Sequence, residues 1–230
     1  IKEAFSSRET LLSDVDVSAR ERRRLHAAGL PQATVSFATV SCSTLLRMER
    51  PLSAPPVGRE TRVLDEALVL EMSGEAEAAE VREVTLRNMT IATIDAASMT
   101  AQPWPRLEAI SLSQNPLGSG DSAAQLWAWL GQCDSLRCLN LNFCELESLE
   151  GIQSLVGLEQ LYMSTNRITD LSPLGSCRQL RTLALHRNAL EDLDSCMATL
   201  SALPQLSDLD LSGNPIWFQP ECKHRCVAEL

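Results

Sequence analysis

The sequence predicts an α/β solenoid of about six stacked repeats, with a parallel sheet on its concave side. Three observations lead to this prediction: a recurring apolar pattern, near-regular intervals between its copies, and an asparagine that closes most copies. The pattern L-x-x-L-x-L-x-x-N-x-L-x-x-L is clearest at residues 158–171. Its six copies begin at residues 81, 107, 136, 158, 180 and 206. One unit of this kind cannot bury its own leucines, but stacked neighbours bury a continuous core.

The L-x-L part of each copy predicts a short strand, because alternate residues of a strand face opposite sides. An asparagine then ends the strand, and its side-chain amide can bond backbone groups that the turn leaves unpaired. Cys144 takes this place in the third copy, where a thiol is a weaker substitute. Met89 takes it in the first copy and can donate nothing, so we expect a distorted first turn. The asparagines of the other copies are Asn115, Asn166, Asn188 and Asn214.

The intervals predict what lies on the convex side. Intervals of 22 residues leave room for little more than a turn or a 3₁₀ coil. The interval of 29 holds residues 119–133, which predict a true helix capped by Asp121 or Ser122, and residues 197–203 predict a shorter helix. We expect tryptophans and a phenylalanine to pack this helix and the C-terminal cap, and Trp104 to sit in a convex loop. The packing residues are Trp127, Trp129, Trp217 and Phe218.

The ends of the chain predict lids for the solenoid, because an open solenoid exposes its core. Within the first part we expect a helix at 18–30, a strand at 33–42, a proline-rich linker at 51–60, a strand at 64–72 and an acidic turn or short helix at 73–81. The expected divisions are a basic, partly extended N-terminal extension (1–62), a capping or degenerate repeat (63–80), the repeats (81–217) and the start of a C-terminal cap (218–230).

Charge is divided unevenly along the chain. Residues 1–62 hold 10 Lys and Arg against 7 Asp and Glu, and residues 63–230 hold 10 against 23, which makes the net charges +3 and −13. An acidic repeat region argues against direct nucleic-acid binding. One predicted basic helix could dock on an acidic surface such as tubulin or a phosphoprotein. Alternatively, its basic face could be solvated, or it could fold onto the chain's own acidic repeats. Its arginines are Arg20, Arg22, Arg23 and Arg24.

The sequence contains none of the catalytic or nucleotide-binding motifs that we sought. It has no G-x-G-x-x-G, Walker, H-E-x-x-H or G-x-S-x-G motif, so we expect no enzyme, no cofactor and no small-molecule substrate. Cys138 and His186 fall two strands apart, too far for a direct hydrogen bond. Cys222 and Cys226 lack the partner pair that a zinc site needs, so we expect two cysteines on one helical turn and no metal. No apolar run is long enough to span a membrane.

Aromatic and basic side chains gather on the predicted concave face of copies three to five. The other outward-facing positions of the strands are mostly small and polar. Exposed aromatics beside arginine have the composition of an interface hot spot. The partner-binding residues that we predict are Phe143, Tyr162, His186, Arg187, Asn142, Gln160, Asp208 and Asp210.

The pattern over residues 81–217 resembles the leucine-rich repeat, in its short intracellular subclass of about 22 residues. The turn Asn214-Pro215-Ile216 and the following Pro220 resemble the C-terminal cap of that subclass, although Cys222 stands in its aromatic place. The short repeats and this cap resemble those of ciliary and axonemal leucine-rich-repeat proteins. The resemblance implies a non-catalytic scaffold in a cytoskeletal assembly, with tubulin or axonemal proteins as partners.

Two other functions stay open. The chain could be a regulatory subunit that resembles the phosphatase-binding member of the subclass, or a nuclear ribonucleoprotein subunit that holds a partner protein. The eight cysteines are too few for a disulfide scaffold, so we expect reduced thiols in the cytoplasm, at a cilium or flagellum axoneme, with the nucleus as the alternative. Because the sequence does not begin with Met, we interpret it as a section of a longer protein.

Overall fold

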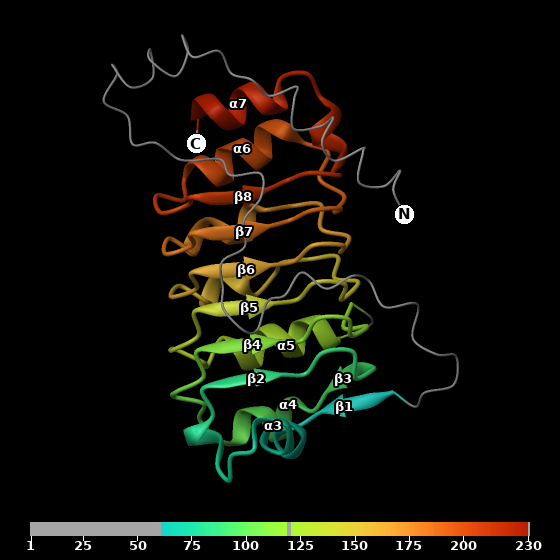
Figure 1. Ribbon diagram of the computed structural model, residues 1–230, viewed down its shortest axis with the longest axis vertical. Coiled ribbons are helices and arrows are strands. Elements are labelled where there is room, and N and C mark those ends of the chain that lie inside the picture. Colours follow the sequence, from blue (N-terminus) through green and yellow to red (C-terminus); the bar gives the residue numbers. More distant parts are fainter. Residues whose placement is uncertain (1–60, 119–120, 230) are drawn as a thin grey trace, which may run out of the picture. The chain divides into compact units, whose positions relative to one another are not determined.

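A computed structural model describes residues 61–118 and 121–229 of the chain. Six short strands form one parallel sheet in the order β2-β4-β5-β6-β7-β8, so sequence neighbours are also neighbours in space (Figure 1). The predicted solenoid with a parallel sheet is confirmed. The strands are β2 (Glu83–Thr85), β4 (Ala109–Ser111), β5 (Cys138–Asn140), β6 (Gln160–Tyr162), β7 (Thr182–Ala184) and β8 (Asp208–Asp210).

Each strand begins two residues after the start of its sequence copy, and all six lie in register. Glu83 pairs with Ala109, Ala109 with Cys138, and the same row continues through Gln160 to Thr182 and Asp208. The middle residue of every strand is a buried valine, isoleucine or leucine. The register therefore confirms that equivalent positions of successive copies form straight rows across the sheet.

Asparagine side chains bind neighbouring repeats together behind the ends of the strands. Asn166 donates through Nδ2 to the carbonyl oxygens of Leu141 and Met163 and accepts at Oδ1 from the amides of Cys144 and Leu146, over 2.8–3.1 Å. These bonds satisfy backbone groups that the turn would otherwise leave unpaired in the core. Comparable bonds are made by Asn115, Asn188 and Asn214.

Cys144 replaces only part of the asparagine chemistry. Its thiol donates to the carbonyl oxygen of Leu112 at 3.3 Å and to that of Asn142 at 3.6 Å, but thiol donors are weak. The side chain is fully buried, and burial raises the pKa of this thiol to about 12. The prediction of a weaker substitute at this position therefore agrees with the observed bonds.

One residue in every copy has a left-handed backbone, directly before the asparagine position. In the copies that carry Met89 or Cys144 instead of asparagine, the next residue is left-handed as well, with φ of 57° at Thr90 and 59° at Glu145. The predicted distortion of the first turn is confirmed, and the third turn shares it. The left-handed residues common to all copies are Asn88, Gln114, Phe143, Thr165, Arg187 and Gly213.

The other side of the solenoid follows the interval lengths. The two 22-residue intervals carry only the 3₁₀ turns η2 (Ile152–Ser154) and η3 (Ser172–Ser176), as predicted. The 29-residue interval carries the predicted helix, α5 (Ser122–Leu130), which lies behind the sheet in Figure 1. The shorter helix is α6 (Leu193–Ser201), which begins four residues before its predicted start because the Asp192 carboxylate caps it by accepting from the Ser195 amide.

The N-terminal lid differs from the prediction. Residues 64–72 were expected as a strand, but only β1 (Arg62–Leu64) is extended, and α3 (Glu66–Ser73) follows it. The physical reason is a pair of caps: Asp65 accepts from the Leu68 amide at 2.8 Å, and Gly74 ends the helix with φ of 77°. Next come η1 (Ala78–Glu80), at the predicted acidic turn, and β3 (Ile91–Ile94), which pairs with β1; α4 (Ala96–Ala101) completes the return path.

The core is one continuous apolar cluster that runs from Leu64 to Cys226. Trp104 was expected in a convex loop, but it is 1% exposed, meets Trp129 edge-on at 5.8 Å and donates through Nε1 to the carbonyl of Met99. Trp127 and Trp129 are buried as predicted. Phe218 was expected to pack the cap, but it is 81% exposed at the end of the 3₁₀ turn η4 (Pro215–Phe218). The residue of this turn that enters the core is Ile216.

The C-terminal lid is helix α7 (Cys222–Glu229), which packs against α6. Cys222 and Cys226 occupy one turn of this helix and are both buried, as the sequence predicts. Trp217 packs partly against the core, and the Lys223 ammonium lies 5.2 Å from its ring centroid. Across the described ranges, every helix is too short or too polar to cross a membrane.

Candidate functional site

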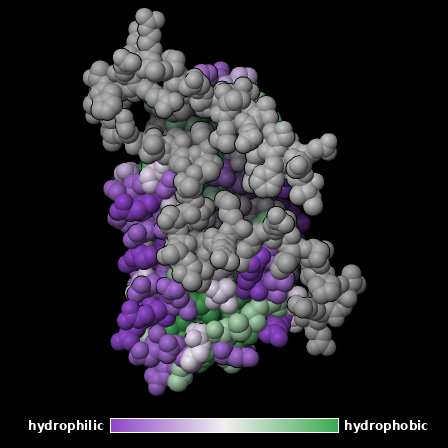
Figure 2. Space-filling model, in the orientation of Figure 1, coloured by the Kyte–Doolittle hydropathy of each residue, from purple (hydrophilic) through white to green (hydrophobic). Residues whose placement is uncertain are grey.

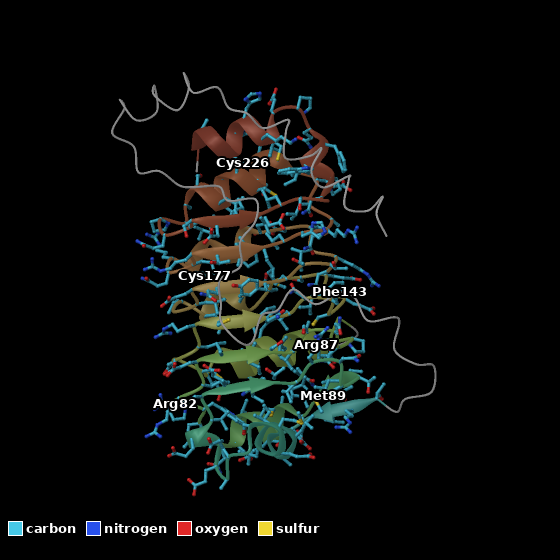
Figure 3. All side chains as sticks on the ribbon, viewed as in Figure 1. Arg82, Arg87, Met89, Phe143, Cys177 and Cys226 are labelled. Atoms are coloured by element: carbon cyan, nitrogen blue, oxygen red, sulfur yellow. The ribbon has the colours of Figure 1, made fainter. Side chains whose placement is uncertain are left out.

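The edge where the strands begin carries alternating charges. Arg82 lies 3.7 Å from Glu108, and Glu159 lies 3.9 Å from both Arg137 and Arg181. Figure 2 shows hydrophilic residues along this edge, at left, and Figure 3 places Arg82 there. Exposed pairs of this kind contribute little to stability, but they compensate one another's charge. This edge therefore offers a charged partner little net attraction.

The middle of the sheet face carries a small apolar cluster that is separate from the core. Its members are Ala109, Cys138 and Tyr162, with Ala184 packed against them. We expected Tyr162 as an exposed aromatic, but it is 4% exposed, and its hydroxyl donates to Gln160 Oε1 at 3.4 Å. The contacts of Tyr162 with Ala109, Cys138 and Ala184 join four neighbouring strands, and sequence reasoning did not foresee them.

The opposite edge, where the strands end, has a different composition. We call it the strand-end edge and define it by the last two outward positions of each copy. None of its members is acidic, although residues 63–230 carry a net charge of −13. In Figure 3 the labelled Arg87 and Phe143 lie on this side, across the sheet from Arg82. The strand-end edge consists of Arg87, Asn88, Ser113, Gln114, Asn142, Phe143, Ser164, Thr165, His186, Arg187, Ser212 and Gly213.

Hydrogen bonds fix the polar side chains of this edge. Arg87 donates through Nε to Gln114 Oε1 at 3.2 Å, and the Asn142 side chain accepts from the Ser164 amide at 2.6 Å. Backbone bonds link the same row, from Phe143 to the carbonyl of Ser164. A side chain that is already fixed loses less conformational entropy when a partner binds.

Phe143 is the largest apolar side chain of the strand-end edge. It is half-buried and, among the described residues, lies outside both apolar clusters. Its φ of 59° is left-handed, a conformation that costs a bulky residue roughly 1–2 kcal/mol. Gly213 holds the equivalent position in the last copy without this cost. The ring is therefore kept at the surface, in a strained turn that glycine would occupy more easily.

His186 takes part in a three-residue hydrogen-bonded chain. The Ser212 hydroxyl donates to Asp210 Oδ1, because an ionised carboxylate can only accept. The Ser212 oxygen must then accept from His186 Nδ1, which lies 2.7 Å away. His186 Nδ1 is thus engaged at Ser212 as the donor. The order Asp–Ser–His also differs from a nucleophile triad, where histidine bridges serine and aspartate.

The structure separates the predicted partner-binding residues into three groups. Phe143, Asn142, His186 and Arg187 share the strand-end edge, whereas Tyr162 and Gln160 belong to the middle of the face. Asp208 and Asp210 lie on the last strand, where Asp208 accepts from Thr182 Oγ1 at 3.5 Å. Sequence reasoning missed the hydrogen bond between Ser212 and His186 and the left-handed backbone of the turn residues. In the sequence, only Gly213 indicated that conformation. The arginines predicted as a docking patch, between residues 20 and 24, lie outside the described residues.

The described residues do not assemble an obvious reactive centre. Cys138 lies on β5 and His186 follows β7, two strands away, as the repeat register implied. The cysteines of the described ranges are buried, and burial raises the pKa of Cys133 to about 12 and those of Cys177 and Cys196 to about 11. Thiols of this kind are poor nucleophiles. Over residues 61–118 and 121–229, no three His, Cys, Asp or Glu side chains converge as a metal site would require.

Known proteins resemble this chain in sequence and in structure. The family model described as "Leucine Rich repeats (2 copies)" matches residues 134–176. The crystal structure of an LRIM1/APL1C complex aligns with a TM-score of 0.53 and 20% identity, over 66% of this chain and 26% of that one. The fold is the leucine-rich repeat solenoid.

Relatives with two different names align over about half of the chain. Leucine-rich repeat-containing protein 56 is 40% identical over 117 residues in Rattus norvegicus and over 116 residues in Homo sapiens. Human serine/threonine-protein kinase 11-interacting protein is 30% identical over 153 residues, which are 56% of this chain and 13% of that protein. The first two alignments cover 51% and 50% of this chain but only 20% of each relative, so the chain spans about one fifth of their length.

Proposed function

We propose that this chain is a non-catalytic scaffold that binds a partner protein on the concave face of its repeats. The observation that supports this most is the strand-end edge, which combines fixed polar groups, an arginine and a strained aromatic in one row. Aromatic residues and arginine dominate the energetics of protein interfaces. Solenoids of this kind present extended concave surfaces that serve binding.

The relatives are consistent with an interaction role. One of them is named for its interaction with a serine/threonine kinase. A shared fold does not by itself define a function, so the partner has to be argued from the surface. For this chain the strand-end edge is the surface in question.

The assembly that we propose is cytoskeletal, at a cilium or flagellum axoneme, with tubulin or axonemal proteins as partners. Its support is the likeness of the short repeats and of the Asn214-Pro215-Ile216 cap to ciliary leucine-rich-repeat proteins. A phosphatase-regulating role would favour a face rich in acids and aromatics. Of the face residues on the six strands, only Glu83, Asp208 and Asp210 are acidic, which favours the scaffold. A nuclear ribonucleoprotein role predicts splicing proteins as partners instead.

Affinity capture of the tagged full-length protein from ciliated cells tests this proposal. We expect tubulin or axonemal proteins in the capture, and we expect them to be lost with Phe143→Gly. The matched control is Phe218→Gly, which removes an aromatic that is 81% exposed at the cap. Capture of a phosphatase or of splicing proteins would overturn the cytoskeletal assignment. Axonemal partners that survive Phe143→Gly but not Phe218→Gly would move the binding site to the cap.

A second capture at raised salt separates the scaffold from a charge-driven regulatory complex. Salt screens contacts between exposed charges, whereas contacts made mainly by apolar groups persist. A scaffold contact centred on the Phe143 ring should survive the higher salt. A complex that dissociates completely would favour the regulatory alternative.

A further inference from the structure

We infer that the strand-end edge binds an extended acidic segment of the partner, with an apolar side chain against Phe143 and a carboxylate at Arg187. This inference rests on the proposed concave-face function and names the chemistry that the partner must supply. It follows from three features of the described residues: the charge of the edge, the strained aromatic and the spacing between the two side chains.

Charge complementarity selects an acidic occupant. No member of the strand-end edge carries a negative charge, while Arg187 is exposed and, among the described residues, forms no ion pair. Of the acids close to other members of this edge, Glu145 and Glu147 lie 3.3 and 3.2 Å from the guanidinium of Arg167, and Asp210 accepts two hydrogen bonds from Ser212. The domain's net negative charge would repel an acidic segment at long range, but physiological salt screens charges beyond about 8 Å. The local charge of the edge therefore decides which kind of segment binds there.

The aromatic selects an apolar contact within that segment. Phe143 keeps a ring in a left-handed turn where the last copy has Gly213, so its presence costs stability. The left-handed conformation recurs in every copy, so it belongs to the repeat; what distinguishes the third copy is that an aromatic ring stands there. The ring is flanked by polar, hydrogen-bonded neighbours that would form the rim of an apolar contact.

The spacing fixes the motif. Phe143 follows β5 and Arg187 follows β7, so the two residues are two strands apart, or about 10 Å. An extended peptide rises about 3.3 Å per residue, so residues three apart are also separated by about 10 Å. A segment that lies along the edge would therefore carry its acid three residues from its apolar residue. His186 has Nδ1 engaged at Ser212, which leaves Nε2 as the ring nitrogen that can bond the segment.

A direct binding measurement tests the motif on the purified full chain. The probe is a fluorescent seven-residue peptide with leucine at its centre and glutamate three positions away on each side, otherwise serine and threonine. Its controls have lysine in place of both glutamates, or serine in place of leucine. We expect fluorescence polarisation to show binding of the first peptide at least tenfold tighter than of either control.

Protein variants locate the contact. Arg187→Glu should lower the affinity for the acidic peptide at least tenfold, and Phe143→Gly should lower it by a similar factor. The matched control Arg178→Glu makes the same charge change at an exposed arginine in the turn before β7, and should change affinity less than twofold. Circular dichroism checks that each variant is folded, and glycine is suited to the left-handed turn at position 143.

Several results would overturn the inference. They are equal weakening by Arg187→Glu and Arg178→Glu, tighter binding of the lysine peptide, or no difference among the three peptides. The inference and the proposed function can fail separately. If the capture loses its partners with Phe143→Gly but the acidic peptide does not bind, the concave-face scaffold stands and the acidic motif is wrong. If the capture is indifferent to Phe143→Gly, the proposed site itself is wrong.

Discussion

The carbonyl oxygen of Glu145 occupies the space where a side chain on Gly118 would begin. A Cβ on Gly118 would lie 1.8 Å from that oxygen, far inside any allowed contact. The close approach comes from the third turn, where Cys144 stands in place of asparagine and Glu145 is left-handed. The Gly118 amide also donates to the Cys144 carbonyl at 3.0 Å. A departure from the repeat pattern in one copy is thus accommodated by a glycine in the preceding copy.

Gly118→Ala should therefore destabilise the domain strongly. Relieving the clash requires backbone movement in two repeats, and overpacking of this type costs about 3 kcal/mol or more. The matched control is Gly175→Ala, because a Cβ there would meet nothing within 4 Å. Chemical denaturation should show a large loss of unfolding free energy for Gly118→Ala and a change within about 1 kcal/mol for Gly175→Ala. Equal effects would mean that the third turn can rearrange freely.

Asn166→Ala should cost at least about 3 kcal/mol of unfolding free energy. The substitution removes four hydrogen bonds and leaves buried backbone groups of two repeats without partners. Cys144→Ala is the comparison, since it removes only two weak thiol bonds, and it should cost about 1 kcal/mol. Urea titrations of both variants measure the difference. An equally small effect at Asn166 would show that the asparagine ladder is dispensable.

Phe143→Gly should leave unfolding free energy within about 1 kcal/mol of the parent. Relief of the left-handed strain offsets the lost apolar contact and the greater freedom of glycine in the unfolded chain. The reverse substitution at the equivalent site, Gly213→Ala, should destabilise by about 1–2 kcal/mol, because its Cβ would also lie 3.0 Å from Arg187 Cγ. If Phe143→Gly instead unfolds the domain, the ring has a structural role and the strain argument is wrong.

The buried thiols should make the fold sensitive to alkali. Burial raises the pKa of Cys133 and Cys144 from the ordinary 9.0 to about 12, so the folded state holds protons that the unfolded state releases. Their contribution is complete below pH 9 and is lost as pH rises from about 9 to 12. Unfolding free energy should therefore fall as pH rises above about 9, and less so in Cys144→Ala. At pH 8, in a Cys42→Ser background, a thiol reagent should react only after denaturant is added.

The repeat pattern predicted the sheet well because each of its parts corresponds to one structural feature: leucines to buried positions, asparagines to bonded turns, and intervals to the elements on the other side. Residues 64–72 were misassigned because their apolar residues suit either a strand or a helix. The information that distinguishes the two lay outside the run, in the caps Asp65 and Gly74. Short apolar runs are ambiguous by periodicity alone, and such caps decide between the two structures.

The candidate site was less predictable than the fold. The rows across the sheet follow from register, so the position of Phe143 could be predicted. Its left-handed backbone could not, since the equivalent residues differ in every copy and only Gly213 indicates the conformation. Tyr162 packs with Ala109, Cys138 and Ala184 of neighbouring strands, contacts that sequence spacing alone does not reveal. The exposure of Phe218 depends in the same way on which residue of the turn enters the core.

Photo-crosslinking from position 143 tests the central claim most directly. Benzoylphenylalanine in place of Phe143 keeps an aromatic ring at the strand-end edge, and the control carries it in place of Val156, which is 61% exposed in the turn after η2. Our account predicts that irradiation in ciliated cells joins position 143 to an axonemal protein, at a segment with an acid three residues from an apolar side chain, and that position 156 gives no such product. Crosslinks to that partner from position 156 and none from position 143 would contradict it.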